Sequence, residues 1–167
     1  GLLKPVSKGV YFIGEKPVDE ELFFDEYVDD GKGMFVGYQL FNDVGISNYV
    51  DCKIEIYTNN IKSKQKSVGQ YFLKKVDLEF DDDTIDLVAL LEIIDTGYSM
   101  KGCDFMAYKK TVDMLLKSYS DSSFEKIIKA IRYKYSTIKQ LSELLEANSI
   151  ENCCVDIFES TYKNLIR

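Results

Sequence analysis

Clustered carboxylates are the residues whose types and spacing come closest to a metal site in this sequence. Asp81, Asp82 and Asp83 are contiguous, and Asp86 follows three residues later. Carboxylate oxygens hold Mg²⁺, but the ligands of such a site converge from separate parts of a fold. At the start of a helix, acids cap free backbone N–H groups and favour the helix dipole. The contiguous spacing therefore favours helix capping here.

A second group combines two acids with a lysine, the residue types that some nucleases use. Asp51, Lys53 and Glu55 lie close together, but their order and spacing do not match such a motif. Strand alternation places Lys53 and Glu55 on an outer, solvated face. One alternative remains open, a Mg²⁺-dependent nuclease or nucleotidyltransferase-like enzyme. It would need its carboxylates to converge within about 5 Å, and they would be Asp81, Asp83 and Asp86, or Asp51 and Glu55.

Cysteine and histidine content limits other chemistry. The chain has no histidine, which excludes histidine general bases and Ser-His or Cys-His pairs. Its four cysteines form no C-x-x-C pair, which argues against a zinc site; they are Cys52, Cys103, Cys153 and Cys154. We expect four reduced thiols, no catalytic residue, no metal and no cofactor.

A lysine-rich loop is the best candidate for an interaction site. Residues 61–76 contain five lysines and no acid. Three of the lysines stand at every second position, so an extended segment would present them on one side, as a ridge facing an acidic surface or phosphate. The other interpretation is a solvated hairpin tip. The predicted contacts are Lys62, Lys64, Lys66, Lys74 and Lys75.

Strands and short helices are expected in the first half of the chain. Strands are predicted over 10–13, 50–58 and 71–76, with the last two pairing as a long hairpin. Asp19 is placed to cap a helix through Val28, and residues 34–44 show helical spacing that Gly45 ends.

Helices are expected from residue 81 onward. Asp83 is placed to cap a helix over 84–94, and Ser122 to Glu125 reads as a capping box. Apolar stripes at helical spacing follow through 105–119, 124–131, 138–145 and 155–165. The order predicts an α+β fold, with a small mixed or antiparallel sheet and a β-hairpin in the first half and a helical C-terminal half.

Length and charge bound the class of protein. The 167 residues suit one domain or a domain with a small appendage. The net charge of −7 disfavours general nucleic-acid binding by the body of the chain. No apolar run is long enough to cross a bilayer and no signal peptide is visible, so we expect a cytoplasmic protein without a membrane partner. The first residue is Gly, so we treat the N-terminus as cut.

Several segments, taken in order, resemble a known family. Residues 2–11 resemble the wing of a winged helix, and 37–46 are similar to a Gly-x-x-Leu-x-Asn-x-Leu-Gly-Leu helix and turn. The family with these segments in this order is the AbiE-type antitoxins of abortive infection. Further segments that resemble it are 55–59, 73–75, 87–94 and 127–145. The helix-turn-helix that precedes the wing in the family is not among these residues, either because the chain is cut before the wing or because this relative lacks it.

The resemblance implies a non-catalytic antitoxin of a type IV toxin–antitoxin pair. Such proteins repress their own operon through the winged helix and oppose a nucleotidyltransferase-like toxin. Residues 1–17 would be the wing remnant and 18–167 an α+β effector domain, with no small-molecule substrate. The wing residues that would contact operator DNA are Lys4, Ser7 and Lys8. A mobile-element interaction module without a DNA target is a further alternative.

Overall fold

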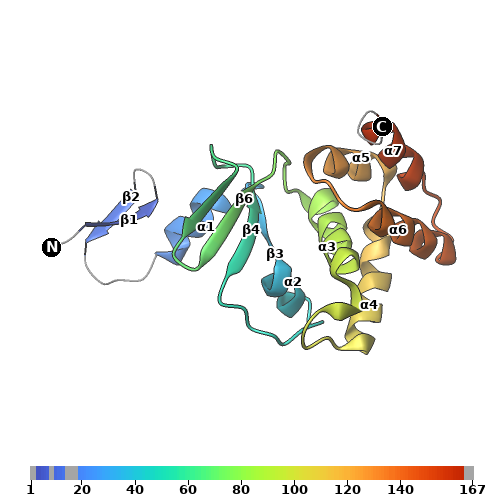
Figure 1. Ribbon diagram of the computed structural model, residues 1–167, viewed down its shortest axis with the longest axis horizontal. Coiled ribbons are helices and arrows are strands. Elements are labelled where there is room, and N and C mark those ends of the chain that lie inside the picture. The colour runs from blue at the N-terminus through green and yellow to red at the C-terminus, as the bar shows by residue number, and fades with distance from the viewer. Residues whose placement is uncertain (1–2, 8–9, 14–18, 164–167) are drawn as a thin grey trace.

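The structure is a computed structural model. It describes the backbone of residues 3–7 and 10–13, and residues 19–163 with their side chains. Along the long axis lie a hairpin, a four-stranded sheet and a group of helices (Figure 1). The fold is α+β, with strands in the first half and helices in the second, as the sequence predicts. None of the helices in the described ranges is long and apolar enough to span a membrane.

The strands form two sheets. Strands β1 (Leu3–Ser7) and β2 (Val10–Ile13) pair as an antiparallel hairpin. The second sheet has the order β3-β4-β6-β5. Its strands are β3 (Gly33–Val36), β4 (Ile54–Thr58), β5 (Gln65–Val68) and β6 (Tyr71–Lys75).

The predicted long hairpin between residues 50–58 and 71–76 is wrong. Strands β4 and β6 lie parallel, while β5 turns back on β6 to make a short antiparallel hairpin. After β4 the chain skips one strand position and forms β5 at the edge of the sheet. It then reverses direction and forms β6 between β4 and β5. This order needs long-range pairing, which a pattern of alternating residues does not specify.

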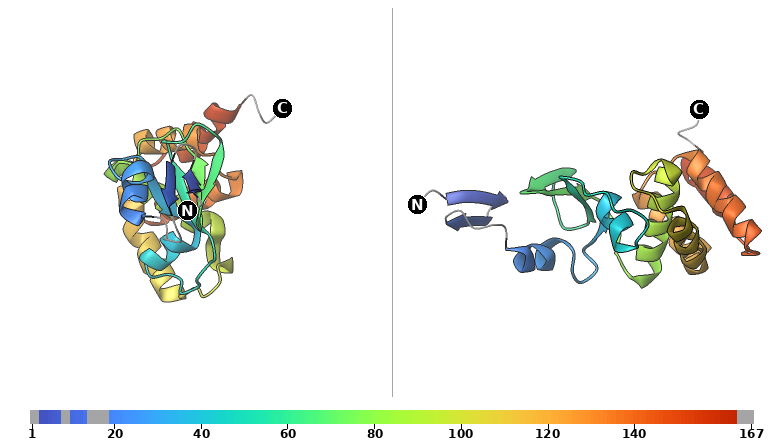
Figure 2. Two further views of the ribbon diagram at one scale, coloured as in Figure 1. Left: turned by 90° about the vertical axis from the view of Figure 1, so that its left-hand side faces the viewer. Right: turned by 90° about the horizontal axis from the view of Figure 1, so that it is seen from below.

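A short helix and the longest helix cover different parts of the sheet. Helix α1 (Glu20–Tyr27) packs Phe23 and Tyr27 against Ile56, Leu73 and Tyr71 on one face. On the other face, α2 (Gly37–Asp43) and α3 (Asp82–Thr96) join Met34, Val36 and Tyr57 in the larger core. The remaining helices extend this core away from the sheet (Figure 2).

Those remaining helical segments stack against α3 and one another in the C-terminal half (Figure 1). Their central positions are fully buried apolar residues, for example Phe124, Ile127, Ile138 and Leu141. They are η1 (Gly97–Ser99), α4 (Phe105–Leu115), η2 (Leu116–Ser118), α5 (Asp121–Ala130), α6 (Tyr135–Ala147) and α7 (Cys154–Tyr162).

Helix starts depend on side-chain caps, and two predicted caps are displaced. Asp19 caps α1 as predicted, its carboxylate accepting from the N–H of Leu22 at 3.3 Å. The cap of α3 is Asp81 rather than Asp83, in a reciprocal pair with Thr84. Helix α5 is capped by Ser120, two residues before the predicted box. In both helices the capping residue is the one with extended backbone just before the first turn.

The segment after residue 33 is not helical throughout, contrary to the prediction of a helix over 34–44. Residues 33–36 form β3, and the helix begins only at Gly37. Gly37 has a φ of 62°, and a Cβ there would stand 2.9 Å from a carboxylate oxygen of Glu55. Gly45, with a φ of 77°, ends α2 as predicted. Pairing with β4 overrides the helical spacing of 34–36.

Candidate functional site

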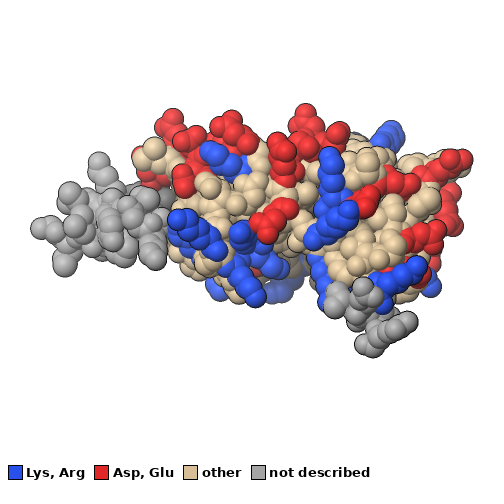
Figure 3. Space-filling model, turned by 90° about the horizontal axis from the view of Figure 1, so that it is seen from above, with Lys and Arg blue, Asp and Glu red and all other residues tan. Residues whose placement is uncertain are grey.

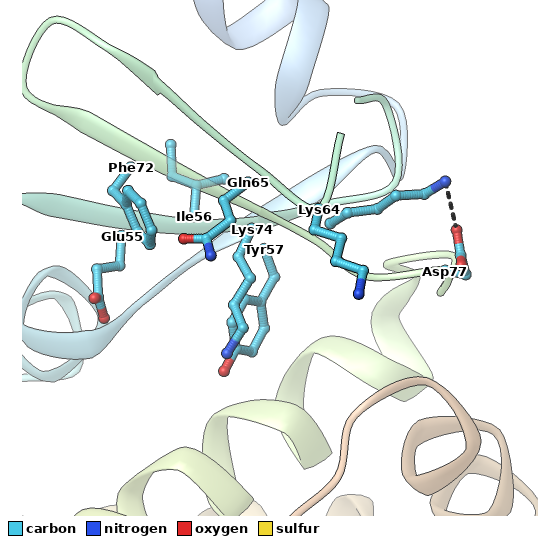
Figure 4. A pocket seen from close by; sticks show the side chains of 9 residues that line it. Glu55, Ile56, Tyr57, Lys64, Gln65, Phe72, Lys74 and Asp77 are labelled. Atoms are coloured by element: carbon cyan, nitrogen blue, oxygen red, sulfur yellow. Dashed lines mark ion pairs between the residues drawn. The ribbon is translucent and has the colours of Figure 1, made fainter. Parts of the chain in front are cut away.

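The face of the sheet opposite α1 carries a hollow of about 540 Å³. Strand alternation sends Tyr57, Phe72 and Lys74 to this side, while Ile56 and Leu73 enter the core under α1. Figure 4 shows Phe72, Tyr57 and Lys74 projecting from the same side of the sheet. The hollow is lined by Glu55, Ile56, Tyr57, Lys64, Gln65, Phe72, Lys74, Lys75 and Asp77.

A second hollow of about 410 Å³ adjoins the first and shares Tyr57, Lys74 and Lys75 with it. It adds Glu92 and Asp95 of α3 and the segment 130–134. We call the two hollows together the basic groove. It lies between the sheet and the helical half of the molecule, and residues far apart in the sequence form its walls.

One acid of the groove binds two tyrosine hydroxyls. The Oε1 atom of the half-buried Glu92 accepts from Tyr57 at 3.0 Å and from Tyr133 at 2.8 Å. These contacts join β4, α3 and the segment before α6. Burial raises the pKa of Glu92, and burial next to this carboxylate also raises the pKa of both tyrosines. Glu92 is therefore a structural acceptor.

The other acids near the groove are also engaged, with one exception. Asp95 accepts from Thr137 and pairs with Lys134 at 3.2 Å. Asp77 pairs with Lys75 at 3.4 Å. Glu55 is exposed and, among the described residues, has no ion pair within 4.0 Å.

Three cations of the groove keep their charge available. Lys64, Lys74 and Arg132 are exposed and form no ion pair with any described residue. Lys74 stands 5.5 Å from the centre of the Tyr57 ring, and Arg132 is 5.4 Å from that of Tyr162. In the view from above, Lys and Arg gather over the middle and the lower left of the molecule, while most Asp and Glu lie along the upper edge and at the right-hand end (Figure 3). The groove can therefore attract an anion although the chain carries −7.

The predicted lysines divide between the two faces of the sheet. Lys64, Lys74 and Lys75 line the groove. Lys66 lies across from Leu73, and its Nζ donates to the Tyr27 hydroxyl at 2.8 Å on the α1 side. Lys62 is exposed outside both hollows. The expected ridge of Lys62, Lys64 and Lys66 on one side is therefore wrong. Only residues 65–68 of this segment form a strand, and the pairing of that strand places Lys66 on the α1 side.

The structure describes only part of the predicted wing residues. Lys4 and Ser7 lie on strand β1, but their side chains are outside what the structure describes, and Lys8 is outside the described residues altogether. Their role as DNA contacts stays a prediction.

Three carboxylates of the enzyme alternative each have a hydrogen-bond partner of their own. Asp81 caps α3, Asp86 accepts from the Ser118 hydroxyl at 2.9 Å, and Asp51 accepts from the N–H of Lys53 at 3.4 Å. Within residues 19–163, no three His, Cys, Asp or Glu side chains stand together as a metal site would require. The convergence of Asp81, Asp83 and Asp86 that this alternative predicts is not found in the described part of the chain. All four cysteines are free thiols.

Sequence reasoning missed part of the site. Glu92 interrupts an apolar run between Leu91 and Ile93, and this acid within a buried stripe is the signal that could have indicated it. Tyr133 and Arg132 carry no such signal, because only the packing of α5 and α6 brings their segment to the sheet.

The fold and groove define the class, an α+β protein with a basic, aromatic groove at the border of its sheet. Neither the protein-family models nor the curated proteins nor the solved structures contain a match to this chain.

Proposed function

We propose that this protein is a non-catalytic antitoxin and transcriptional regulator of a type IV toxin–antitoxin system. It is cytoplasmic and counteracts a nucleotidyltransferase-like toxin. The order of the family-like segments along the chain carries this proposal. The effector part is residues 18–167, and residues 1–17 form the remnant of a DNA-binding wing.

The segment 37–46 supports the proposal because each of its family-like positions has a physical role. Gly37 allows a left-handed start beside Glu55, and Leu40 is buried. The side-chain amide of Asn42 donates to the carbonyl of Tyr49 at 2.9 Å. Gly45 turns the chain, and the buried Ile46 anchors it through a bond from its N–H to the Phe41 carbonyl.

The hairpin β1–β2 supports the DNA-binding half of the proposal. A wing is a two-stranded antiparallel hairpin, and Leu3 pairs here with Ile13 in that arrangement. The hairpin precedes the sheet at the N-terminal end of the molecule (Figure 1). This is the position that a wing at the end of a DNA-binding module would occupy.

Neutralisation is tested by co-expression. The proposal predicts a nucleotidyltransferase-like reading frame beside this gene. That reading frame is induced in a bacterial host with the antitoxin chain or with a frameshifted copy of it. We expect growth to be restored only by the intact chain. Continued arrest, with the intact chain soluble and folded in the same cells, would overturn the proposal.

Operator binding is tested by an electrophoretic shift on the DNA upstream of the gene. The protein carries whatever residues its gene encodes before Gly1, and the paired variant changes Lys4 and Lys8 to alanine. We expect a shift that the variant weakens while growth rescue stays intact. Rescue without any shift at low salt would assign the chain to the interaction-module alternative.

A further inference from the structure

An aromatic ring and a lysine without an ion pair among the described residues are held at a fixed spacing on the floor of the basic groove. Phe72 and Lys74 lie two residues apart on β6, so their side chains share one face at a separation of roughly 7 Å. Phe72 is half-buried at the edge of the hollow, with the Nζ of Lys53 5.9 Å from its ring centre. Parallel pairing sets Glu55 opposite Phe72 and Tyr57 opposite Lys74.

Charge along the groove suits a ligand with more than one phosphate. Lys64 and Lys74 are available in the first hollow, and Arg132 in the second. Three of the four acids already have partners. Glu92 accepts from Tyr57 and Tyr133, Asp95 contacts Thr137 and Lys134, and Asp77 pairs with Lys75. Glu55 has no ion pair among the described residues, and it lies beside Phe72, at the end of the groove away from Arg132. Glu92 keeps its carboxylate in the second hollow, where Arg132 and Lys134 lie with it.

The shape of the groove distinguishes between phosphate-bearing ligands. A site for one nucleotide cradles its phosphates with glycine-rich backbone at a helix N-terminus, and no glycine of the described ranges lines either hollow. Two adjoining hollows instead form a track past exposed side chains. A duplex presents stacked bases and cannot place one on Phe72, whereas a single strand has bases free to stack on an aromatic ring while its backbone follows lysines.

We infer that the basic groove binds a short single-stranded stretch of nucleic acid. One base stacks on Phe72, with the Gln65 amide in the same hollow available to its edge, and neighbouring phosphates contact Lys64 and Lys74 and then Arg132. The site is separate from the hairpin that would contact a duplex operator, so the inference does not rest on the proposed function.

Fluorescence anisotropy tests this inference on the complete chain. The probes are labelled eight-nucleotide oligouridine, the matching oligodeoxythymidine, and a duplex of the same length, each at about 50 mM salt, where phosphate contacts are strongest. We expect both single strands to bind at least about tenfold more tightly than the duplex. The ratio of the two single-strand affinities then identifies RNA or DNA as the preferred source of the strand.

Matched variants locate the binding. The double variant Lys64→Ala/Lys74→Ala should weaken single-strand binding at least about tenfold. The control Lys62→Ala/Lys126→Ala removes the same charge from exposed positions outside the groove, and we expect less than about a twofold change. Phe72→Leu keeps an apolar side chain but removes the stacking surface, and should cost roughly fivefold or more.

Three results would overturn the inference. They are equal affinity for duplex and single strands, equal losses in the two lysine pairs, or unchanged binding in Phe72→Leu. Thermal melting of every variant confirms that the fold is retained. Since growth rescue is measured separately, loss of strand binding and loss of antitoxin activity are distinguishable.

Discussion

The two faces of the four-stranded sheet use the same strands for different purposes. Under α1, Ile56 and Leu73 are fully buried, and Tyr71 stacks on Phe23 with ring centres 4.3 Å apart. On the groove side, their strand neighbours Glu55, Phe72 and Lys74 are exposed or half-buried. One face is therefore buried along β4 and β6, whereas on the other face only Met34, Val36 and Tyr57 join the core and Glu55, Phe72 and Lys74 stay accessible.

Neighbouring residues on β6 give the largest expected contrast. Leu73→Ala should lower the free energy of unfolding by about 3–4 kcal/mol, because it opens a cavity in a fully buried cluster. Phe72→Leu, one position away, should cost less than about 1 kcal/mol, because its ring is already partly in water. Urea denaturation followed by circular dichroism measures both. Equal losses would mean that the groove side is also core.

Glu92 is the next test, because it ties the groove side to the helical half. Glu92→Ala leaves the Tyr57 and Tyr133 hydroxyls without their acceptor, and should cost about 2 kcal/mol. Glu92→Gln keeps an acceptor oxygen and should cost much less. A similar loss in the two variants would show that charge, rather than hydrogen bonding, matters at this position.

The same carboxylate predicts a pH dependence with a definite sign. Because burial raises the pKa of Glu92 in the folded state, the folded protein holds its proton more tightly than the unfolded chain does. Its contribution to stability is therefore full below the ordinary carboxyl pKa and declines as pH rises through the raised value. Urea denaturation at a series of pH values should show this decline in the wild type. A wild-type slope retained in Glu92→Gln would assign the dependence to other groups.

Helix α3 forms the far wall of the groove, and its cap gives a smaller effect. Asp81→Ala should cost about 1 kcal/mol through loss of the bonds to Thr84, while Asp83→Ala, which removes no cap, should be nearly neutral. Thermal melting of the pair separates them. The opposite ranking would restore Asp83 as the cap and contradict the arrangement described above.

The smallest predicted effect compares lysines on the two faces. Lys66→Ala loses a hydrogen bond and a cation–π contact with Tyr27, and should cost about 0.5–1 kcal/mol. Lys64→Ala should leave stability unchanged within about 0.5 kcal/mol, because this exposed side chain has no ion pair among the described residues. Chemical denaturation of both variants checks the ranking. A larger loss for Lys64 would mean that the groove lysines are structural.

Sequence patterns predicted the parts of the fold that depend on local spacing. Apolar residues at helical intervals identified the helices from α3 to α7, with buried positions such as Leu87, Ile127 and Ile138. Alternation identified β4 and β6, and glycine chemistry identified the end of α2 at Gly45. These features depend on neighbours within a few residues, so they can be read along the chain.

Strand order and the groove were decided by the tertiary structure alone. Insertion of β6 between β4 and β5 made the β4–β6 pair parallel and sent Lys66 away from Lys64. Packing of the helical half brought Glu92 and Tyr133 to Tyr57. The amino-acid sequence by itself determined which residues share a face of each element. Which faces meet is decided by strand pairing and by burial of apolar surface. The free energies of both depend on contacts between residues far apart in the sequence, which a local pattern does not specify.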